Sequence, residues 1–197
     1  MDANIVDDYV KFSLQNQPII TSCKYLLYTQ GDISCKPVCS EKLNEYSGNG
    51  IVTLGANVSS VILNLKIKQG CSYQLLFENF LACTRGIKLI VCETSKYCTL
   101  QNLSNEIQYI WIVAFGKYEK ITIKDDENIT LTKDILLIFD NKLKFIESEN
   151  FYKITGPCTF YIQTKFKDGE CGSKISLWNI LNNARNDKKL RDKLRNI

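Results

Sequence analysis

Residues 121–146 read ITIKDDENITLTKDILLIFDNKLKFI, and residues 65–90 read LKIKQGCSYQLLFENFLACTRGIKLI. The two stretches align without a gap at an offset of 56 residues, and apolar positions largely face apolar positions. Six positions are identical: Ile67/Ile123, Lys68/Lys124, Leu75/Leu131, Leu81/Leu137, Lys88/Lys144 and Ile90/Ile146. A hydrophobic phase that survives over this length indicates an internal structural repeat.

A weaker third copy begins near Ile19. It places Leu26-Leu27-Tyr28 at the position that Phe80-Leu81-Ala82 occupies in the second copy. The stretches that separate the copies also match one another, at 50–55, 109–116 and 159–164. We therefore expect three repeated units with a period of about 55 residues.

The pattern within each unit predicts β-strands. Short alternating or continuous apolar stretches, rich in Ile, Val, Leu, Tyr and Phe, are separated by polar turns such as 68–70 and 124–128. The expected strands are 61–67, 73–77, 80–83, 87–91, 109–115, 121–123, 129–131, 135–139, 143–146 and 159–166. Helical periodicity begins only near residue 174. The sequence predicts an all-β fold, a sandwich of three pseudo-repeated β-units, followed by a basic α-helical C-terminal tail.

Length and composition fit one folded domain with an appendage. The chain has 197 residues, of which 45% are hydrophobic and 23% charged, and this balance excludes disordered, collagen-like and disulfide-stapled classes. The longest uncharged apolar runs, such as 107–115 and 135–139, are too short to cross a bilayer. We expect a β-sandwich domain over residues 1–173 and a tail over 174–197.

The chain contains no histidine. This excludes Ser-His-Asp and Cys-His catalytic sites, facial-triad iron sites and zinc sites that contain histidine. The nine cysteines are odd in number, and no signal-peptide or Arg-rich transit pattern stands at the acidic amino terminus. The sequence therefore predicts a reduced, cytoplasmic protein without a disulfide framework.

Two patterns in the sequence are candidates for a chemical site. Cys35 and Cys39 form a C-x₃-C turn that Cys158 and Cys171 could complete as a zinc site, but the spacing is loose, and we favour buried hydrophobes and surface thiols. The acidic run 125–127 coincides with a turn of the repeat, so we expect a solvated turn rather than a cation or acid/base site. We expect no catalytic residue, no metal and no cofactor, and hence a protein that is not an enzyme.

Charge is divided unevenly between body and tail. The net charge is +4, yet residues 174–197 carry seven basic and two acidic residues, a net +5, and residues 1–173 carry a net −1. Three of the four arginines of the chain lie in the tail. A basic arm on a near-neutral body is a common way to bind a nucleic-acid backbone.

The tail has the pattern of an amphipathic helix. Ser176 is a candidate N-cap, and the apolar positions that follow at helical spacing are Leu177, Ile180, Leu181 and Ala184. The residues predicted to bind RNA are the cations of this segment: Lys174, Arg185, Lys188, Lys189, Arg191, Lys193 and Arg195. The alternatives are a solvated helix packed on the sandwich, an anionic membrane surface or an acidic protein partner.

The closing part of the repeat resembles a known family. Residues 109–146, followed by Ile154-Thr155-Gly156-Pro157-Cys158-Thr159-Phe160-Tyr161-Ile162-Gln163-Thr164-Lys165, resemble the family named for altered inheritance of mitochondria (its twenty-fourth member). Its features here are Ala114-Phe115-Gly116, an acidic turn, Phe139-Asp140 and the Gly-Pro hairpin, and the resemblance covers roughly 15–167. It implies a β-sandwich of pseudo-threefold repeats, similar to the tryptophan RNA-binding attenuation protein fold. The family supplies no recognised catalytic residues.

Two functional hypotheses follow. The first is a non-enzymatic ribosome- or RNA-associated protein that docks by its sandwich on rRNA and ribosomal proteins, grips rRNA with the tail and acts as a dormancy (hibernation) factor. The second, which the family resemblance implies, is a mitochondrial protein that organises the inner membrane and acts in its biogenesis. Neither requires a small-molecule substrate or a transmembrane segment.

Overall fold

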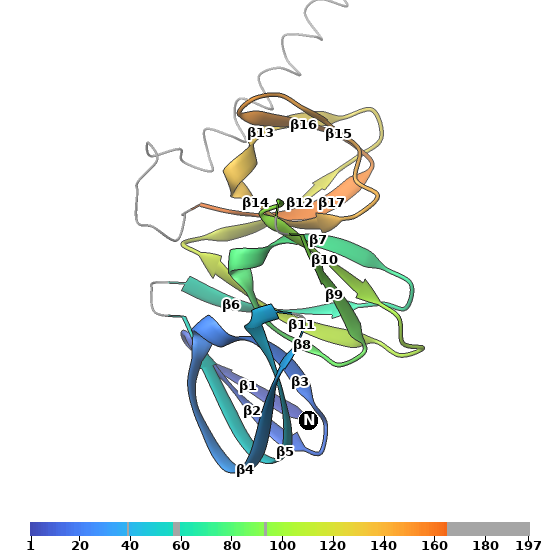
Figure 1. Cartoon of the computed structure of the whole chain (residues 1–197). Coiled ribbons are helices and arrows are strands. Elements are labelled where there is room, and N and C mark those ends of the chain that lie inside the picture. The colour runs from blue at the N-terminus through green and yellow to red at the C-terminus, as the bar shows by residue number, and fades with distance from the viewer. Residues whose placement is uncertain (39, 57–59, 93, 165–197) are drawn as a thin grey trace, which may run out of the picture. The chain divides into compact units, whose positions relative to one another are not determined.

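The computed structural model describes residues 1–38, 40–56, 60–92 and 94–164. It divides into two compact units, of which the first is Met1–Phe115 and the second begins at Gly116 (Figure 1). The regular structure of the described residues consists of β-strands and three single-turn 3-10 helices. The predicted all-β class is confirmed.

The first unit contains an eight-stranded antiparallel sheet in the order β1-β2-β5-β3-β8-β11-β6, with β4 paired to β5 (Figure 1). Its strands are β1 (Asp2–Val6), β2 (Tyr9–Gln15), β3 (Ile19–Ser22), β4 (Leu26–Val38), β5 (Ser40–Gly55), β6 (Ser60–Ile67), β8 (Phe80–Thr84) and β11 (Gln108–Phe115). Three further strands of this unit pair in the order β7 (Ser72–Leu76), β10 (Tyr97–Asn102) and β9 (Ile87–Val91).

Alternation of side chains builds the core of the first unit. In β2 the buried residues Val10, Phe12 and Leu14 alternate with half-buried or exposed polar and tyrosine side chains. The Phe12 ring meets the Trp111 ring edge to face, with 4.7 Å between centroids and 89° between planes. This geometry is favourable for aromatic pairs, so β2 and β11 are held against one another by a specific contact as well as by burial.

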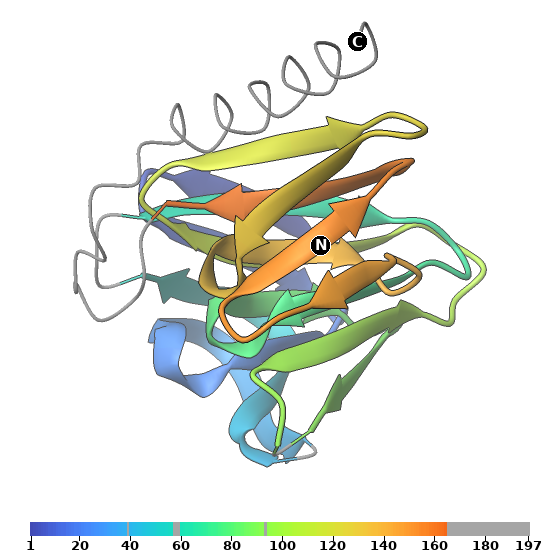
Figure 2. The same ribbon diagram turned by 90° about the horizontal axis from the view of Figure 1, so that it is seen from above.

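The second unit has two groups of three antiparallel strands (Figure 2, yellow to orange). One follows the order β12 (Tyr118–Ile123), β17 (Cys158–Gln163) and β14 (Leu136–Asp140). The other follows the order β13 (Asn128–Thr132), β16 (Phe151–Thr155) and β15 (Phe145–Glu147). The rings of Phe139 and Tyr152 lie 6.0 Å and 4.6 Å from the Phe145 ring and form an aromatic cluster in this unit.

Strand pairing follows the sequence repeat. In the first unit β6 pairs with β11, β7 and β9 with β10, and β8 with β11. In the second unit, β12 pairs with β17, β13 and β15 with β16, and β14 with β17, in the same order along the chain. The β8–β11 and β14–β17 pairings each contain one register shift.

Each repeat also contains a 3-10 turn at the same place. The helix η2 (Phe77–Asn79) joins β7 to β8, and η3 (Lys133–Ile135) joins β13 to β14. Their bounds differ by the 56 residues of the sequence offset. The helix η1 (Cys23–Tyr25) joins β3 to β4 in the corresponding way.

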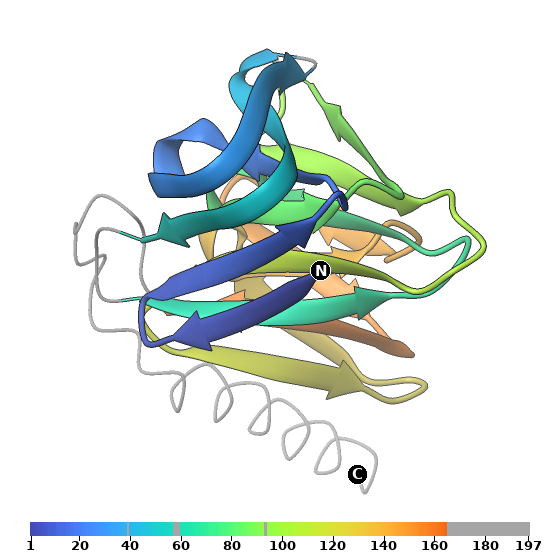
Figure 3. The same ribbon diagram turned by 90° about the horizontal axis from the view of Figure 1, so that it is seen from below.

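The first copy is built from one long hairpin, β4–β5, which curls strongly (Figure 3). The amino-terminal part of β5 pairs with β3 and its carboxyl-terminal part with β2. Gly48 permits the close approach of β5 to β4, because its φ is +116° and a Cβ there would lie 2.2 Å from the carbonyl oxygen of Asp32.

The expected strands from residue 61 onward are present, with ends that differ by a few residues. We expected no strand at 2–6, 9–15, 97–102 or 151–155, and we did not predict the long hairpin or the 3-10 turns. The pattern at 9–15 does alternate and is typical of a strand, whereas the other three stretches are short and partly polar. The expected boundary between residues 173 and 174 lies outside the described residues and stays a prediction.

Candidate functional site

The cations predicted to bind RNA lie in the part of the chain that the structure leaves undescribed: Lys174, Arg185, Lys188, Lys189, Arg191, Lys193 and Arg195. The same holds for the predicted tail helix. Immediately before this part, β17 pairs with β12 on one side and with β14 on the other. The last described strand therefore has both of its neighbours without a contribution from the tail.

The described cysteines form no cluster with other metal-ligating side chains. No group of three or more Cys, Asp or Glu side chains suited to a metal occurs in residues 1–38, 40–56, 60–92 and 94–164. Cys35 is exposed on β4, and Cys158 is half-buried at the start of β17. Cys39 and Cys171 lie outside the described residues, so the four-cysteine zinc site stays untested.

Two thiols are buried in the first unit and are poorly suited to chemistry. Burial raises the pKa of the Cys98 thiol to about 12, and burial followed by the nearby Cys98 raises the pKa of Cys83 further. A thiol acts as a nucleophile only when it is ionised, so both side chains act as small apolar groups near neutral pH.

The acidic run 125–127 forms a turn, as expected. Asp125 and Asp126 are exposed, and Asp126 has a φ of 63°. The Glu127 carboxylate accepts a hydrogen bond of 3.3 Å from the Lys124 backbone N–H, which closes the turn locally. The carboxylate of Glu127 is thus used to cap its own turn.

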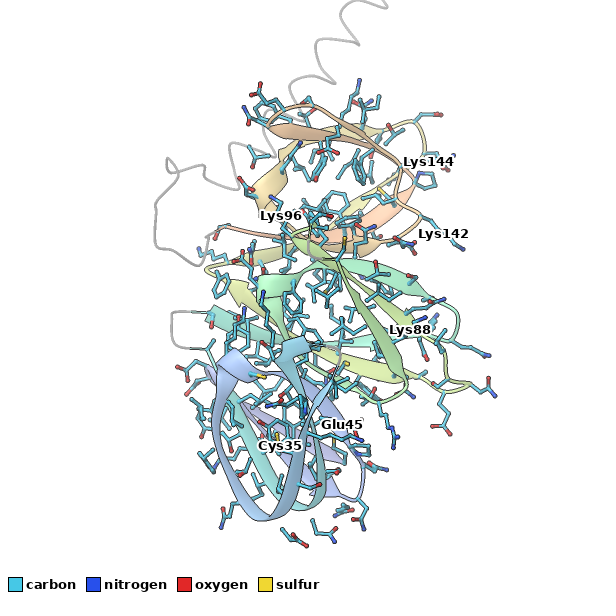
Figure 4. The ribbon with its side chains drawn as sticks, viewed as in Figure 1. Cys35, Glu45, Lys88, Lys96, Lys142 and Lys144 are labelled. Atoms are coloured by element: carbon cyan, nitrogen blue, oxygen red, sulfur yellow. The ribbon has the colours of Figure 1, made fainter. Side chains whose placement is uncertain are left out.

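The most buried carboxylate of the first unit belongs to Glu45 on β5 (Figure 4). Lys36 Nζ lies 2.8 Å from its Oε1, and Arg85 Nε lies 3.9 Å from its Oε2. Both cations are largely exposed, so they cover the carboxylate from the solvent side and tie β4 and the β8–β9 turn to β5. We interpret this group as structural, because a buried carboxylate needs such partners.

The lysines of the two units are dispersed. Figure 4 shows Lys88 on β9 of the first unit, and Lys142 and Lys144 between β14 and β15 of the second, each pointing outward from its own unit. Lys88 and Lys144 occupy equivalent positions of the repeat. Residues 1–173 have a net charge of −1, so neither unit carries the charge excess found in the tail.

The largest exposed apolar run of the first unit lies at the start of β4. Leu26, Leu27 and Tyr28 are 37%, 51% and 45% exposed, although their counterparts Phe80, Leu81 and Ala82 are fully buried. Gly55 on β5 leaves room for Leu27, because a Cβ at Gly55 would lie 2.7 Å from Leu27 Cδ1. These three consecutive residues form an exposed apolar stretch at the edge of the sheet.

A lysine and two tyrosines border this run. Lys11 on β2 and Tyr28 on β4 both pair with Thr53 on β5, so they share one row across the three strands. Hydrogen bonding to Thr53, and then the charge of Lys11, lower the pKa of the Tyr28 phenol. Lys11 Nζ also lies 5.6 Å from the centroid of the Tyr9 ring. We call Tyr9, Lys11, Leu26, Leu27 and Tyr28 the β4 surface.

The β4 surface was not predicted from the sequence. The alignment of Leu26-Leu27-Tyr28 with Phe80-Leu81-Ala82 suggests a shared burial that the structure does not show.

Comparison with known proteins bears on the fold. No protein-family model matches the chain, and no curated protein matches it. The crystal structure of protein SPYM3_0169 from Streptococcus pyogenes, a structural genomics target, is similar with a TM-score of 0.66 and 14% sequence identity. The match covers 82% of this chain and 91% of that chain. Likeness at this identity supports the all-β architecture and nothing finer. In the described residues no helix is long and apolar enough to cross a membrane.

Proposed function

We propose that this chain is a non-enzymatic binding protein that grips RNA, in particular rRNA of the ribosome, with residues 174–197. The observation that carries the proposal is the charge division: a net +5 in the tail against a net −1 in residues 1–173. Phosphate contacts supply most of the affinity in nucleic-acid binding, and a segregated cationic arm supplies them without a specific pocket.

The arginines of the tail strengthen this proposal. The chain has only four arginines, and three of them are Arg185, Arg191 and Arg195. An arginine fork contacts a phosphate through two N–H groups, whereas lysine acts as a point charge. On a ribosome such a protein would dock through its β-units, occupy a tRNA or factor site and act as a dormancy factor in the cytoplasm.

We further propose that the β-units form a sandwich of three pseudo-repeats and that the chain is related to the altered-inheritance-of-mitochondria family. The three 3-10 turns and the recurring strand pairings support the repeat. The resemblance in residues 109–165 supports the relationship. It favours a second candidate function, organisation of the mitochondrial inner membrane.

The dependence of binding on salt tests the RNA proposal. Phosphate contacts displace condensed counterions, so the logarithm of RNA affinity should fall linearly with the logarithm of salt concentration. If roughly four to six tail cations touch phosphate, the slope is about −3 to −5. Changing Arg185, Arg191 and Arg195 together to Ala should flatten the slope by about two to three.

A matched variant separates charge from geometry. Lysine at the same three positions should restore the slope and recover only part of the affinity, because the planar fork is lost. A triple Ala variant that binds RNA as the wild type does would leave the tail as a solvated segment and overturn the proposal.

Sedimentation of tagged protein in cell extract separates the two candidates. Migration with ribosomal subunits that RNase abolishes supports the RNA proposal. Recovery in a mitochondrial membrane pellet, insensitive to RNase, supports the second candidate instead.

A further inference from the structure

Within the first unit, one copy of the repeat covers the next by strand pairing. The strand β8 lies between β11 and β3, and β3 belongs to the preceding copy. The pairs across this contact are Ile19/Thr84, Ile20/Cys83 and Thr21/Ala82. The residues of β8 from Phe80 to Cys83 are fully buried.

The start of β4 is the counterpart of β8. Leu26 and Tyr28 pair with Leu54 and Thr53 on β5, with a register shift between them, as Phe80 and Ala82 pair with Ile112 and Trp111 on β11. Among the described strands, however, β4 pairs only with β5. The edge that β3 covers on β8 is therefore open on β4, and the residues along it are exposed.

The strand β13 has an open edge that is complementary to the open edge of β4. It is the counterpart of β3, since each leads directly into a 3-10 turn. It pairs with β16, and no other described strand lies on its second edge. The side of β13 that corresponds to the β8-binding side of β3 is thus open.

The ladder shows which backbone groups of β13 face this edge. Backbone bonds run from Gly156 N to Glu127 O and from Lys133 N to Asn150 O, at the two ends of the β13–β16 register. Antiparallel ladders alternate between bonded and non-bonded pairs, so the Thr130/Lys153 pair between them is non-bonded. The N–H and C=O of Thr130 therefore point away from β16, toward the open edge.

We infer that β13 of one copy of this chain pairs antiparallel with the start of β4 of a second copy, and thereby repeats between chains the β3–β8 contact found within one chain. Counting from the 3-10 turns, the pairs equivalent to Ile19/Thr84, Ile20/Cys83 and Thr21/Ala82 are Ile129/Gln30, Thr130/Thr29 and Leu131/Tyr28. The contact pairs Tyr28 as β3 pairs Ala82, and Leu27 adjoins this last pair as Leu81 adjoins its counterpart.

The composition of the two edges supports self-association. In natural proteins, charged residues or proline on an edge strand usually prevent it from pairing with another chain. The edge strands β1, β6, β9, β12 and β15 each carry a charged residue, whereas residues 26–30 and 128–132 carry neither a charge nor a proline. The three proposed pairs thus bring no like charges together.

The contact is heterologous, because the two chains contribute different strands. Each chain has one β4 edge and one β13 edge, so association produces a ring if the rotation closes and a filament if it does not. This contact does not require that the tail bind RNA. If the tail does not bind RNA, the self-association is still expected.

Sedimentation velocity of the full chain over a range of concentrations tests the inference. The wild type should form species larger than one chain. Leu27→Asp should sediment as a single chain, because it places a charge directly beside the last pair of the contact, at a position that is already exposed. The matched control is Ile90→Asp, which charges a similarly exposed residue of β9 and should assemble like the wild type.

The β13 edge is tested separately. Thr130→Pro removes the outward N–H and should abolish assembly, whereas Thr130→Ala keeps this N–H and should not. If the proline variant loses its β-type circular dichroism, Thr130→Lys serves in its place, because a lysine blunts the edge without removing backbone groups.

Mixing the variants identifies the head-to-tail geometry. The Leu27→Asp chain retains β13 and the Thr130→Pro chain retains the β4 edge, so an equimolar mixture should form a 1:1 dimer and nothing larger. A wild type that remains a single chain, a Leu27→Asp variant that assembles, or a mixture without the dimer would each overturn the inference.

Discussion

The Tyr25 hydroxyl donates a hydrogen bond of 2.6 Å to the main-chain carbonyl of Glu78. Tyr25 ends η1 and Glu78 lies in η2, so the bond joins the 3-10 turns of two successive copies within the first unit. Burial, and then the charge of Glu78, raise the pKa of the Tyr25 phenol, so this group remains a protonated donor. Lys24 Nζ donates to the same carbonyl.

Tyr25→Phe should lower the free energy of unfolding by about 1 kcal/mol, the typical net contribution of one hydrogen bond. The ring and its packing remain, and Lys24 still satisfies the carbonyl, so a larger loss is not expected. Chemical denaturation of the variant measures the change. Tyr28→Phe is the control, since this exposed phenol joins no two copies, and it should change stability less than Tyr25→Phe does.

Gly48→Ala should destabilise the first unit far more than Gly70→Ala. Both glycines have positive φ, which costs a non-glycine residue roughly 1–2 kcal/mol. A Cβ at Gly48 would also lie 2.2 Å from Asp32 O, a main-chain atom, whereas a Cβ at Gly70 has nothing within 4 Å. Thermal melts of the two variants compare them. An equal loss of stability in the two variants would contradict the close approach of β5 to β4 at Gly48.

Stability should fall with rising pH above about 9, in part because of Cys83 and Cys98. Their thiols stay protonated in the folded protein, since burial raises the pKa of Cys98 to about 12 and that of Cys83 further. The unfolded chain ionises them near pH 9 and then binds fewer protons, so the free energy of unfolding decreases by about 1.4 kcal/mol per pH unit for each thiol.

Denaturation from pH 8 to 11 measures this slope. Cys98→Ala should flatten it by the contribution of one thiol, although it also lowers stability at every pH by removing buried volume. Cys35→Ala, which removes an exposed thiol, is the matched control. A Cys98→Ala slope identical to that of the wild type would show that this thiol is not buried.

Truncation after Ser173 should leave a folded β protein. The reason is that β17 ends at Gln163 and is already paired with β12 and β14, so the described strands are complete before the tail begins. The truncated chain should keep a β-type circular dichroism spectrum and a cooperative melt. Loss of the melt would show that residues 174–197 contribute to the core.

Hydrophobic patterning predicted strands that are strongly apolar, such as the continuous apolar stretch of β11. It missed β1, whose residues are mostly exposed, because such a strand is held by pairing with β2 rather than by an apolar face. It also missed the 3-10 turns, which are too short to show a period. The candidate RNA-binding residues could be proposed from charge alone, since a charge excess needs no fold to be counted.

The sequence by itself determined the all-β class and the division of charge, because each depends on residue type and local spacing along the chain. Only the tertiary structure decided that Leu27 is exposed and Leu81 buried, although the two hold equivalent positions. The two strands also differ in their neighbours, because β8 lies between β11 and β3, whereas β4 pairs only with β5 among the described strands. Burial depends on what packs around a strand, and the residues of the strand do not encode it.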